Sequence, residues 1–515
     1  MLTFLLACTG SSDPADVATP PSSPKYQLVV RAALLPASAP MYIAVQDGLV
    51  AEISPTPLDA AALMEADVVT PGLVDAHAHP AGLGKALAEL SLSDCKDFAE
   101  VQQRIRDAAE GDGWLTGRGW DQNDWPDHEG FPTAAELDAL VPDRPVALRR
   151  VDGHAVWLNS KALELSGITP ETRAPEGGRL FDGVLVDAAM ALVGDIPAPS
   201  ETEQRRRLEH ALAEIRSSGL VGVHAMGMSD ETLALYGEVE LPVRIWAYVS
   251  PGTEAAERLQ TSGPWGDGRL QVVGVKAFAD GALGSRGAYL SEDYSDEPGH
   301  RGLEITSSSE LAELATALLA QRAQLAVHAI GDAGVRNTLD AFEVARTAHS
   351  DIDLPLRVEH AQVVHPDDVP RFKALNAVAS MQPTHATSDM PWAEERLGPD
   401  RIAWAYAWKT LRDAGALMAF GSDFPVEQHS PSYGLWSAQY RNANAVPYDG
   451  WMPEQKLDFA TTIGLFSEGT YDALGLDGGV IRVGDPADLT LWTMNQRDMG
   501  LWYTASATLV DGEVD

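Results

Sequence analysis

Two histidines separated by one residue, His77 and His79, follow an apolar, β-branched run that begins at Val68. Such a run is typical of a short buried strand with a polar tip. Residues two apart on a strand point to the same side, so both imidazoles can face one point. Imidazole is a common ligand of divalent metal ions, and the spacing therefore predicts a metal site at the end of this strand. A His-x-His pair also occurs on surfaces, so this interpretation needs partners elsewhere in the chain.

Four further residues that suit a metal site follow other apolar runs. They are Lys276, His328, His360 and Asp423. Taken singly, each is explained as well by packing, because a histidine at a strand end is more often a hydrogen-bonded structural residue than a ligand. Together with the histidine pair they favour one shared site, provided that the strands belong to one barrel.

The elements that must position these residues are eight apolar, strand-like runs separated by helical patterns. The runs lie at 73–74, 220–224, 243–249, 270–276, 325–328, 356–360, 378–382 and 417–423, and helical patterns occupy 201–217, 309–322 and 335–347 among the segments between them. Alternation of this kind predicts an α/β fold closed into a (β/α)8 TIM barrel. In that fold the carboxyl ends of the strands converge on one face, where active sites lie.

Both chain ends have a different pattern, with short apolar runs broken by Pro and Gly at 26–69 and 484–512. These runs predict antiparallel β-structure. We expect a composite β-sandwich domain formed by 25–70 and 470–515, with the barrel domain at 71–469 between them. The segment at about 81–200 is too long for a tight loop, so we expect an insertion that lies over the top of the barrel.

The charge of the chain is strongly negative. Its 515 residues contain 37 Lys and Arg against 75 Asp and Glu, a formal net charge of −38. This charge disfavours nucleic acid and anionic lipid as partners, and its simplest explanation is solubility.

The N-terminal residues 1–24 have the composition of a lipoprotein-like signal and tether. The run from Leu5 to Cys8 resembles a bacterial lipobox and precedes a Ser/Pro/Thr/Asp stretch. We therefore expect a lipid on Cys8 and a place in the cell envelope, on the periplasmic or extracytoplasmic face, with this anchor as the only contact with a membrane. No basic residue precedes the short apolar run, so a cytoplasmic location stays open as the alternative.

The order His-x-His, Lys, His, His and Asp along the chain resembles that of the amidohydrolase superfamily. The surrounding strings are similar to its amidohydrolase 3 branch, which includes the N-substituted formamide deformylase-like enzymes. These strings lie at 275–286, 327–332, 358–362, 381–385 and 421–426, with two more in the insertion at 119–122 and 150–160. The similarity extends from Tyr26 onward.

The resemblance implies a metal-dependent hydrolase that cleaves a C–N bond, in an amide or formamide-like small molecule, with a metal-bridged hydroxide. It implies two divalent ions, for which zinc is the expected metal and manganese or cobalt are the alternatives. His77 and His79 would hold the more buried ion, and His328 and His360 the more exposed one. Lys276 would bridge both ions as a carbamate, that is, a carboxylated lysine.

The resemblance also implies roles around the reacting groups. Asp423 would bind the buried ion and transfer the proton of the attacking water to the leaving nitrogen. His154 and His385 would be catalytic or would orient the substrate, and Asp280 and Arg286 would bind it. A brace within one loop explains the Asp/Arg pair equally well. His224 belongs to no such string, and we expect it to be structural.

Other functions stay open at this point. The same site could act on an ester or a lactone, or could catalyse an isomerisation. From another class, a lipid-anchored solute-binding protein would also be acidic, tethered and two-lobed. It would not need metal ligands at strand ends, and metal-dependent turnover distinguishes the two. An oligomer is compatible with every alternative.

Overall fold

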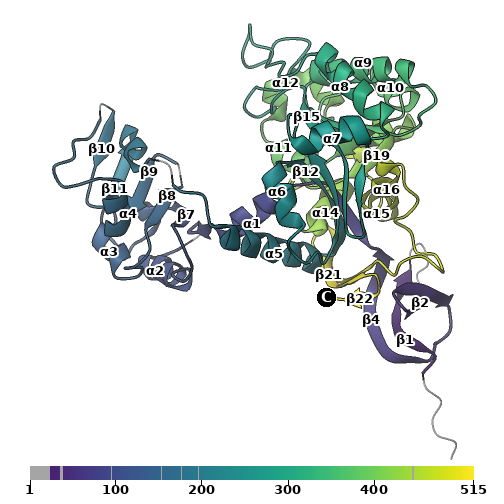
Figure 1. Cartoon of the computed structure of the whole chain (residues 1–515), viewed down its shortest axis with the longest axis horizontal. Helices are drawn as coiled ribbons and strands as arrows, with labels where there is room; N and C mark the ends of the chain where they lie inside the picture. Colours follow the sequence, from purple (N-terminus) through teal and green to yellow (C-terminus); the bar gives the residue numbers. More distant parts are fainter. Residues whose placement is uncertain are drawn as a thin grey trace, which may run out of the picture.

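A computed structural model describes residues 24–34, 39–93, 95–151, 153–175, 177–194, 196–443 and 446–515. Cys8 and the tether lie outside these residues. The described chain has three parts, a barrel, a β domain built from both chain ends and an insertion (Figure 1). No helix in the described ranges combines the length and the apolar character that crossing a membrane requires.

Eight parallel strands form the barrel. In their hydrogen-bonded order these are β5 (Leu73–Ala78), β12 (Leu220–Met228), β13 (Arg244–Val249), β15 (Leu270–Phe278), β16 (Gln324–Ala329), β17 (Leu356–His360), β18 (Ala377–Met381) and β19 (Leu417–Phe420). The first and last approach each other where the backbone N–H of Asp423 donates to the His77 carbonyl at 2.8 Å. Every predicted run is therefore a barrel strand, and the (β/α)8 barrel is confirmed.

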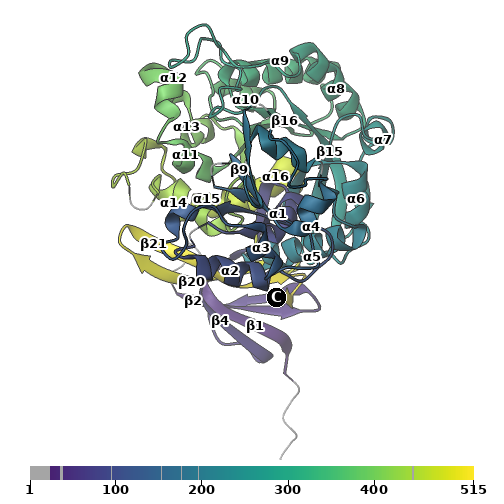
Figure 2. The ribbon, with the colours of Figure 1, turned by 90° about the vertical axis from the view of Figure 1, so that its left-hand side faces the viewer.

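The helices pack around the outside of the barrel, as Figure 2 shows in a view along its axis. α5 (Glu201–Ser217), α8 (Ser308–Ala320) and α9 (Asp332–Ala348) lie where the helical patterns predict them. The Ser200 side chain caps α5 by accepting from the Glu203 N–H. This helix buries Leu208, Leu212 and Ile215, which share one face because they are four and three residues apart. Burial of each such side chain contributes about 1.5–3 kcal/mol.

Both chain ends meet in one seven-stranded mixed sheet. Its strands are β1 (Tyr26–Leu34), β2 (Pro40–Gln46), β3 (Leu49–Ser54) and β4 (Ala60–Pro71) with β20 (Leu489–Arg497), β21 (Gly500–Val510) and β22 (Glu513–Val514). β4 pairs antiparallel with β20, so the composite domain is confirmed. The expected antiparallel pairing also joins β1 to β2, whereas β1 and β4 are parallel. Two strands intervene between β1 and β4 along the chain, and they return it to the same direction.

The insertion is a folded unit with a sheet of its own. It follows α1 (Pro80–Ala88) and contains the strands β6 (Leu90–Ser91), β7 (Leu115–Trp120), β8 (Val146–Arg150), β9 (Ala155–Leu158), β10 (Gly178–Leu180) and β11 (Val184–Asp187) and the helices α2 (Phe98–Asp107), α3 (Ala134–Asp138) and α4 (Ser160–Leu165). Trp120 and Trp157 are fully buried in its separate core.

The insertion lies off the end of the barrel at which β5 ends, and its placement over the top of the barrel stays a prediction. It leaves the carboxyl-terminal end of β5 through α1 and returns through α5, and Figure 2, seen from the side of the insertion, shows it in front of one end of the barrel. The insertion buries its apolar side chains in its own core, so it does not need the barrel surface to do so.

Candidate metal centre

The six predicted ligands gather at the carboxyl-terminal end of the barrel. They are His77 on β5, His79 directly after β5, Lys276 on β15, His328 on β16, His360 on β17 and Asp423 after β19. The ring centroids of His77 and His360 are 4.6 Å apart, and those of His328 and His360 are 4.5 Å apart. The Lys276 Nζ lies 3.0 Å from the Nε2 of His77. Residues up to 346 positions apart in the sequence thus share one place.

His77 is held by a buried carboxylate. Its Nδ1 lies 2.6 Å from Oε2 of Glu359, and a carboxylate at this place accepts, so Nδ1 carries the proton. The lone pair is then on Nε2, which faces Lys276 Nζ and, at 3.5 Å, Oδ1 of Asp423. A hydrogen bond of this kind on the far ring nitrogen is the usual way to orient a metal-binding histidine.

The Nδ1 of His79 is held by a backbone carbonyl. Its Nδ1 lies 3.0 Å from the carbonyl oxygen of Met226, which only accepts, so the proton is on Nδ1. Its Nε2 then faces Oδ1 of Asp423 at 3.1 Å. A proton on Nε2 or a cation between the two atoms accounts for this separation, because a lone pair and a carboxylate oxygen repel each other. The ligand atoms of His77, His79 and Asp423 lie within 4.8 Å of one another, and the donor set therefore fits a divalent metal ion.

A second group shares Asp423 and contains His360 and His385. The Nδ1 of His360 lies 2.9 Å from Oε1 of Gln382, which leaves its Nε2 lone pair for a ligand. His385 differs, because its Nδ1 accepts from the Gln362 amide at 3.1 Å and the proton is then on Nε2. That Nε2 is buried, lies 3.8 Å from Oδ2 of Asp423 and has no hydrogen-bond partner among the described residues. His385 thus directs a proton into the site.

His328 lies beside these groups and not within them. Its Nε2 faces the carbonyl oxygen of Gly281 at 3.4 Å, and its ring packs against Phe278 with centroids 5.2 Å apart. The sequence pairs His328 with His360 at the more exposed ion, and their rings are in contact, but the group of close ligand atoms around His360 contains His385 and not His328. The role of His328 as a ligand stays a prediction.

Burial sets the protonation states at the site. It lowers the pKa of His77 to about 4 and that of His360 well below its usual range. It also lowers the pKa of Lys276 to about 8. Burial alone would raise the pKa of Asp423, but His77 and His79 lower it on balance. Neutral imidazoles and an ionised carboxylate are the forms that bind metal ions.

Strained backbone accompanies two of these residues. His360 has a φ of 73° and Asp423 a φ of 61°, in the left-handed region that non-glycine residues rarely adopt. Successive residues on a strand normally point to opposite sides, yet Glu359 and His360 both contact His77. The left-handed turn at His360 explains how both reach the interior. Strain of this kind concentrates at functional sites.

Sequence reasoning missed the network beneath the metal site. Arg357 and Glu359 are fully buried and paired at 2.7 Å inside the barrel. Arg357 also contacts Nδ1 of His224 at 2.6 Å and the Tyr248 hydroxyl at 3.1 Å, which gives His224 the structural place expected for it. The available signal was an Arg-x-Glu pair within an otherwise apolar strand, where alternation directs both charges to one side.

Two of the predicted substrate residues serve the loop after β15. Buried Asp280 accepts from the backbone N–H groups of Ile330 and Gly331 at 2.9 and 2.7 Å, and thereby joins this loop to the one after β16. Arg286 pairs with Asp296, with Nη2 2.8 Å from Oδ2, on the same loop. These contacts are those of a brace, the alternative interpretation of the pair.

His154 lies on the insertion, directly before β9, and not with the barrel residues (Figure 1). Its side chain is 73% exposed, and its Nδ1 lies 3.0 Å from Oδ1 of Asp187, another residue of the insertion. The structure therefore brings His385 to the site but does not bring His154 there.

Comparison with known proteins agrees with this geometry. The model of the amidohydrolase family matches residues 66–514, and the chain belongs to that family. It is 33% identical over 458 residues to a Bacillus subtilis (strain 168) protein named as an amidohydrolase, YtcJ, with 82% of this chain and 83% of the relative covered. It is 25% identical over 416 residues to the N-substituted formamide deformylase of Arthrobacter pascens, with 73% and 74% covered.

A solved structure shares the architecture. It is that of an uncharacterized metal-dependent hydrolase from Pyrococcus furiosus, with a TM-score of 0.70 and 27% identity, covering 90% of this chain and 97% of that one. Family, fold and ligand geometry together identify a metal-dependent hydrolase.

The Glu359 contact leads to a testable prediction. Glu359→Gln removes the carboxylate that orients His77 and leaves the Arg357 charge without its partner. We expect metal affinity, measured by competition with a chelator, to fall about tenfold to a hundredfold. We expect the free energy of unfolding to fall by about 3–5 kcal/mol, because one partner of a buried ion pair is removed.

Tyr248→Phe is the matched control, since it removes a hydroxyl from the same network without touching His77. It should lower stability and leave metal affinity unchanged. Equal metal affinity in Glu359→Gln and the native protein would show that Glu359 only supports the fold.

Proposed function

We propose that this protein hydrolyses a C–N bond of a small amide or formamide-like substrate with two divalent ions. Zinc is the metal we propose, with manganese or cobalt as alternatives. The observation that carries the proposal is the convergence of His77, His79 and Asp423, whose ligand atoms lie within 4.8 Å of one another, beside a second group that shares Asp423. The likeness to a formamide deformylase supports the choice of bond. Ions bound here would supply Lewis-acid polarisation of a carbonyl and activation of water.

The protein's own residues would move the proton. Asp423 is ionised and buried, so its Oδ2 can accept a proton from the attacking water and deliver it to the leaving nitrogen. The Nε2–H of His385 points to the same carboxylate oxygen and lacks a partner among the described residues. It can donate to the substrate oxygen as negative charge develops there.

Lys276 is proposed to act as a carbamate. An ammonium cannot bind a cation, and a charge of this kind beside two divalent ions would be repelled. Burial lowers the pKa of Lys276 to about 8, so part of the population is a neutral amine near neutral pH. The neutral amine can attack CO2 and lose one proton, which yields an anionic carbamate with two oxygen donors.

Metal removal tests the reaction class. We expect chelation to abolish hydrolysis of N-formyl and N-acyl amines, and added Zn, Mn or Co to restore it. Asp423→Asn should lower kcat by about 10²–10⁴-fold, because the proton acceptor is lost, while metal content falls less than turnover.

Asp351→Asn, on an exposed residue, is the control and should behave like the native protein. Full turnover by metal-free protein would contradict the mechanism.

A second prediction concerns Lys276. Lys276→Ala should lose much of its metal and nearly all its activity, and acetate or propionate should restore part of both by filling the gap with a carboxylate. In the native protein, ¹³CO2 should give a carbamate carbon signal that this variant lacks.

Lys161→Ala, at an exposed lysine of the insertion, controls for the loss of a lysine. A Lys276→Ala protein with full metal content and full rate, without added carboxylate, would mean that Lys276 is no ligand.

We further propose that Cys8 carries lipid and anchors the enzyme in the cell envelope. The support is the lipobox-like run that ends at Cys8 and the tether behind it. Metabolic labelling with a palmitate analogue should mark the native protein and not Cys8→Ser, with Cys95→Ser as the control that keeps the label. Equal labelling of native and Cys8→Ser protein, or none in either, would refute the anchor.

A further inference from the structure

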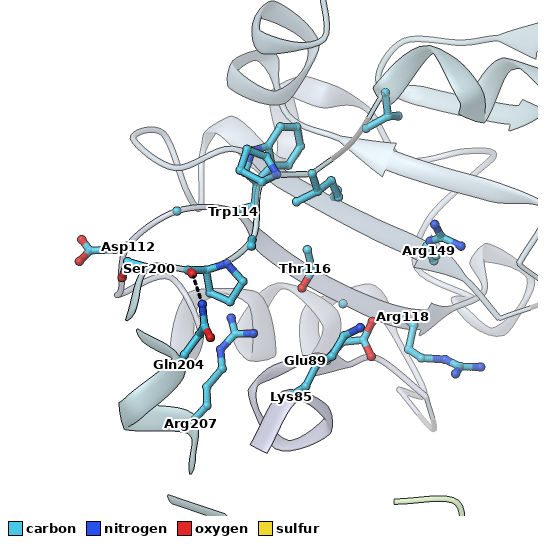
Figure 3. Close-up of a pocket in the computed structure, with 18 of the residues that line it drawn as sticks. Lys85, Glu89, Asp112, Trp114, Thr116, Arg118, Arg149, Ser200, Gln204 and Arg207 are labelled. Atoms are coloured by element: carbon cyan, nitrogen blue, oxygen red, sulfur yellow. Dashed lines mark hydrogen bonds between the residues drawn. The ribbon is translucent and has the colours of Figure 1, made fainter. Parts of the chain in front are cut away.

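A cavity of about 1130 Å³ lies between the insertion and the barrel helices α1 and α5 (Figure 3). One wall is the face of the insertion sheet that carries Thr116 and Arg149, and the opposite wall includes Lys85 and Arg207. None of the metal-centre residues lines this cavity. Its chemistry is therefore separate from that of the metal site.

The charge around the cavity opposes that of the chain. The formal net charge of the protein is −38, yet the lining contains five basic residues and two acidic ones. The basic residues are Lys85, Arg118, Arg149, Arg150 and Arg207, and the acidic ones are Glu89 and Asp112. Two of the basic residues, Arg150 and Arg207, are paired with Asp121 and Glu203 outside the lining, which leaves Lys85, Arg118 and Arg149 to attract an anion. A positive concavity on a strongly acidic protein concentrates small anions.

Two arginines at one end of the cavity stand directly opposite each other. Arg118 on β7 and Arg149 on β8 are register partners and are both exposed. In the described part of the chain, neither has a carboxylate within ion-pair distance. Like charges in this position destabilise a sheet, so folding does not account for them. An anion between the two guanidinium groups would account for both.

The other end of the cavity is apolar. Trp114, Met190 and Val193 pack on a buried cluster of the insertion that contains Ala147 and Val156. Figure 3 shows Trp114 toward one end of the cavity, and Arg118 and Arg149 toward the other. Trp114, directly before β7, and Arg118 are four positions apart in extended chain, which is about 13 Å. The cavity thus offers an apolar surface to one end of a small molecule and a cationic surface to its other end.

We propose that this cavity binds a small amphipathic anion, with its carboxylate or phosphate held by Arg118 and Arg149 and its apolar body against Trp114. Lys85, on α1, faces the same space from the barrel side and adds a third cation. The bound anion therefore joins the insertion to the helix that begins next to His79.

Calorimetry on the full chain tests the site with four eight-carbon probes, octanoate, octyl phosphate, octylammonium and octan-1-ol. We expect an anion to bind and the cation and the alcohol not to bind. The comparison of octanoate with octyl phosphate identifies the head group. Binding of octylammonium as tight as that of the anions, or binding of neither anion, would overturn the proposal.

Variants locate the site. Replacing both arginines, Arg118→Gln with Arg149→Gln, should weaken anion binding by at least about tenfold, because two charge-assisted contacts are lost. Arg173→Gln, at an exposed arginine of the insertion outside the cavity, should have no effect. Should the double variant unfold, Lys85→Gln on the barrel side provides an independent measurement and should also weaken binding. Native affinity in a folded double variant, or in Lys85→Gln when the double variant unfolds, would exclude this site.

A last variant tests the apolar end. Trp114→Ala should weaken binding of the octyl anion and leave binding of inorganic phosphate unchanged. Unchanged affinity for the octyl anion would remove the apolar half of the proposal. These readouts do not depend on turnover, so they stand or fall separately from the proposed hydrolysis.

Discussion

The buried contact between Glu359 and His77 is the constraint on which the site depends. Glu359 carries a negative charge in the barrel interior because Arg357 neutralises it, and that charge fixes the proton of His77 on Nδ1. Only then does the Nε2 lone pair face Lys276 and Asp423. The barrel is thus filled by an ion pair rather than by apolar side chains at this level. Burying such a pair costs desolvation energy. In this protein the pair also orients His77 as a metal-binding residue.

Much of the fold could be predicted from local pattern. All eight barrel strands follow from apolar runs, and α5 follows from its periodicity, because burial of a regular element leaves a regular trace in the sequence. The polar residues at the ends of these runs also predicted which side chains converge at the metal centre. That the ligand atoms of His385, and not those of His328, group with His360 and Asp423 could not be predicted in this way. It depends on side-chain rotation and on partners, Gln362 and Gly281, that come from other elements.

The insertion shows a second limit of local pattern. Its length indicated an insertion, but its position depends on where its apolar side chains find partners, and it supplies these itself around Trp120 and Trp157. The motif resemblance led us to expect His154 at the site, whereas its side chain contacts Asp187 of the insertion. Sequence similarity identifies residues that belong to one family, and the arrangement of two folded units in space is a separate property.

The sheet made from both chain ends has a mechanical consequence. β4 leads through Gly72 directly into β5, which carries His77, and β4 is held by its pairing with β20. The Gly72 N–H donates to the Asp488 carbonyl at 2.8 Å, and Leu73 N–H to the Thr490 hydroxyl at 3.3 Å. The last thirty or so residues of the chain therefore anchor the base of the first metal-binding strand. A shortened C-terminus would loosen a ligand that lies more than 400 positions earlier in the sequence.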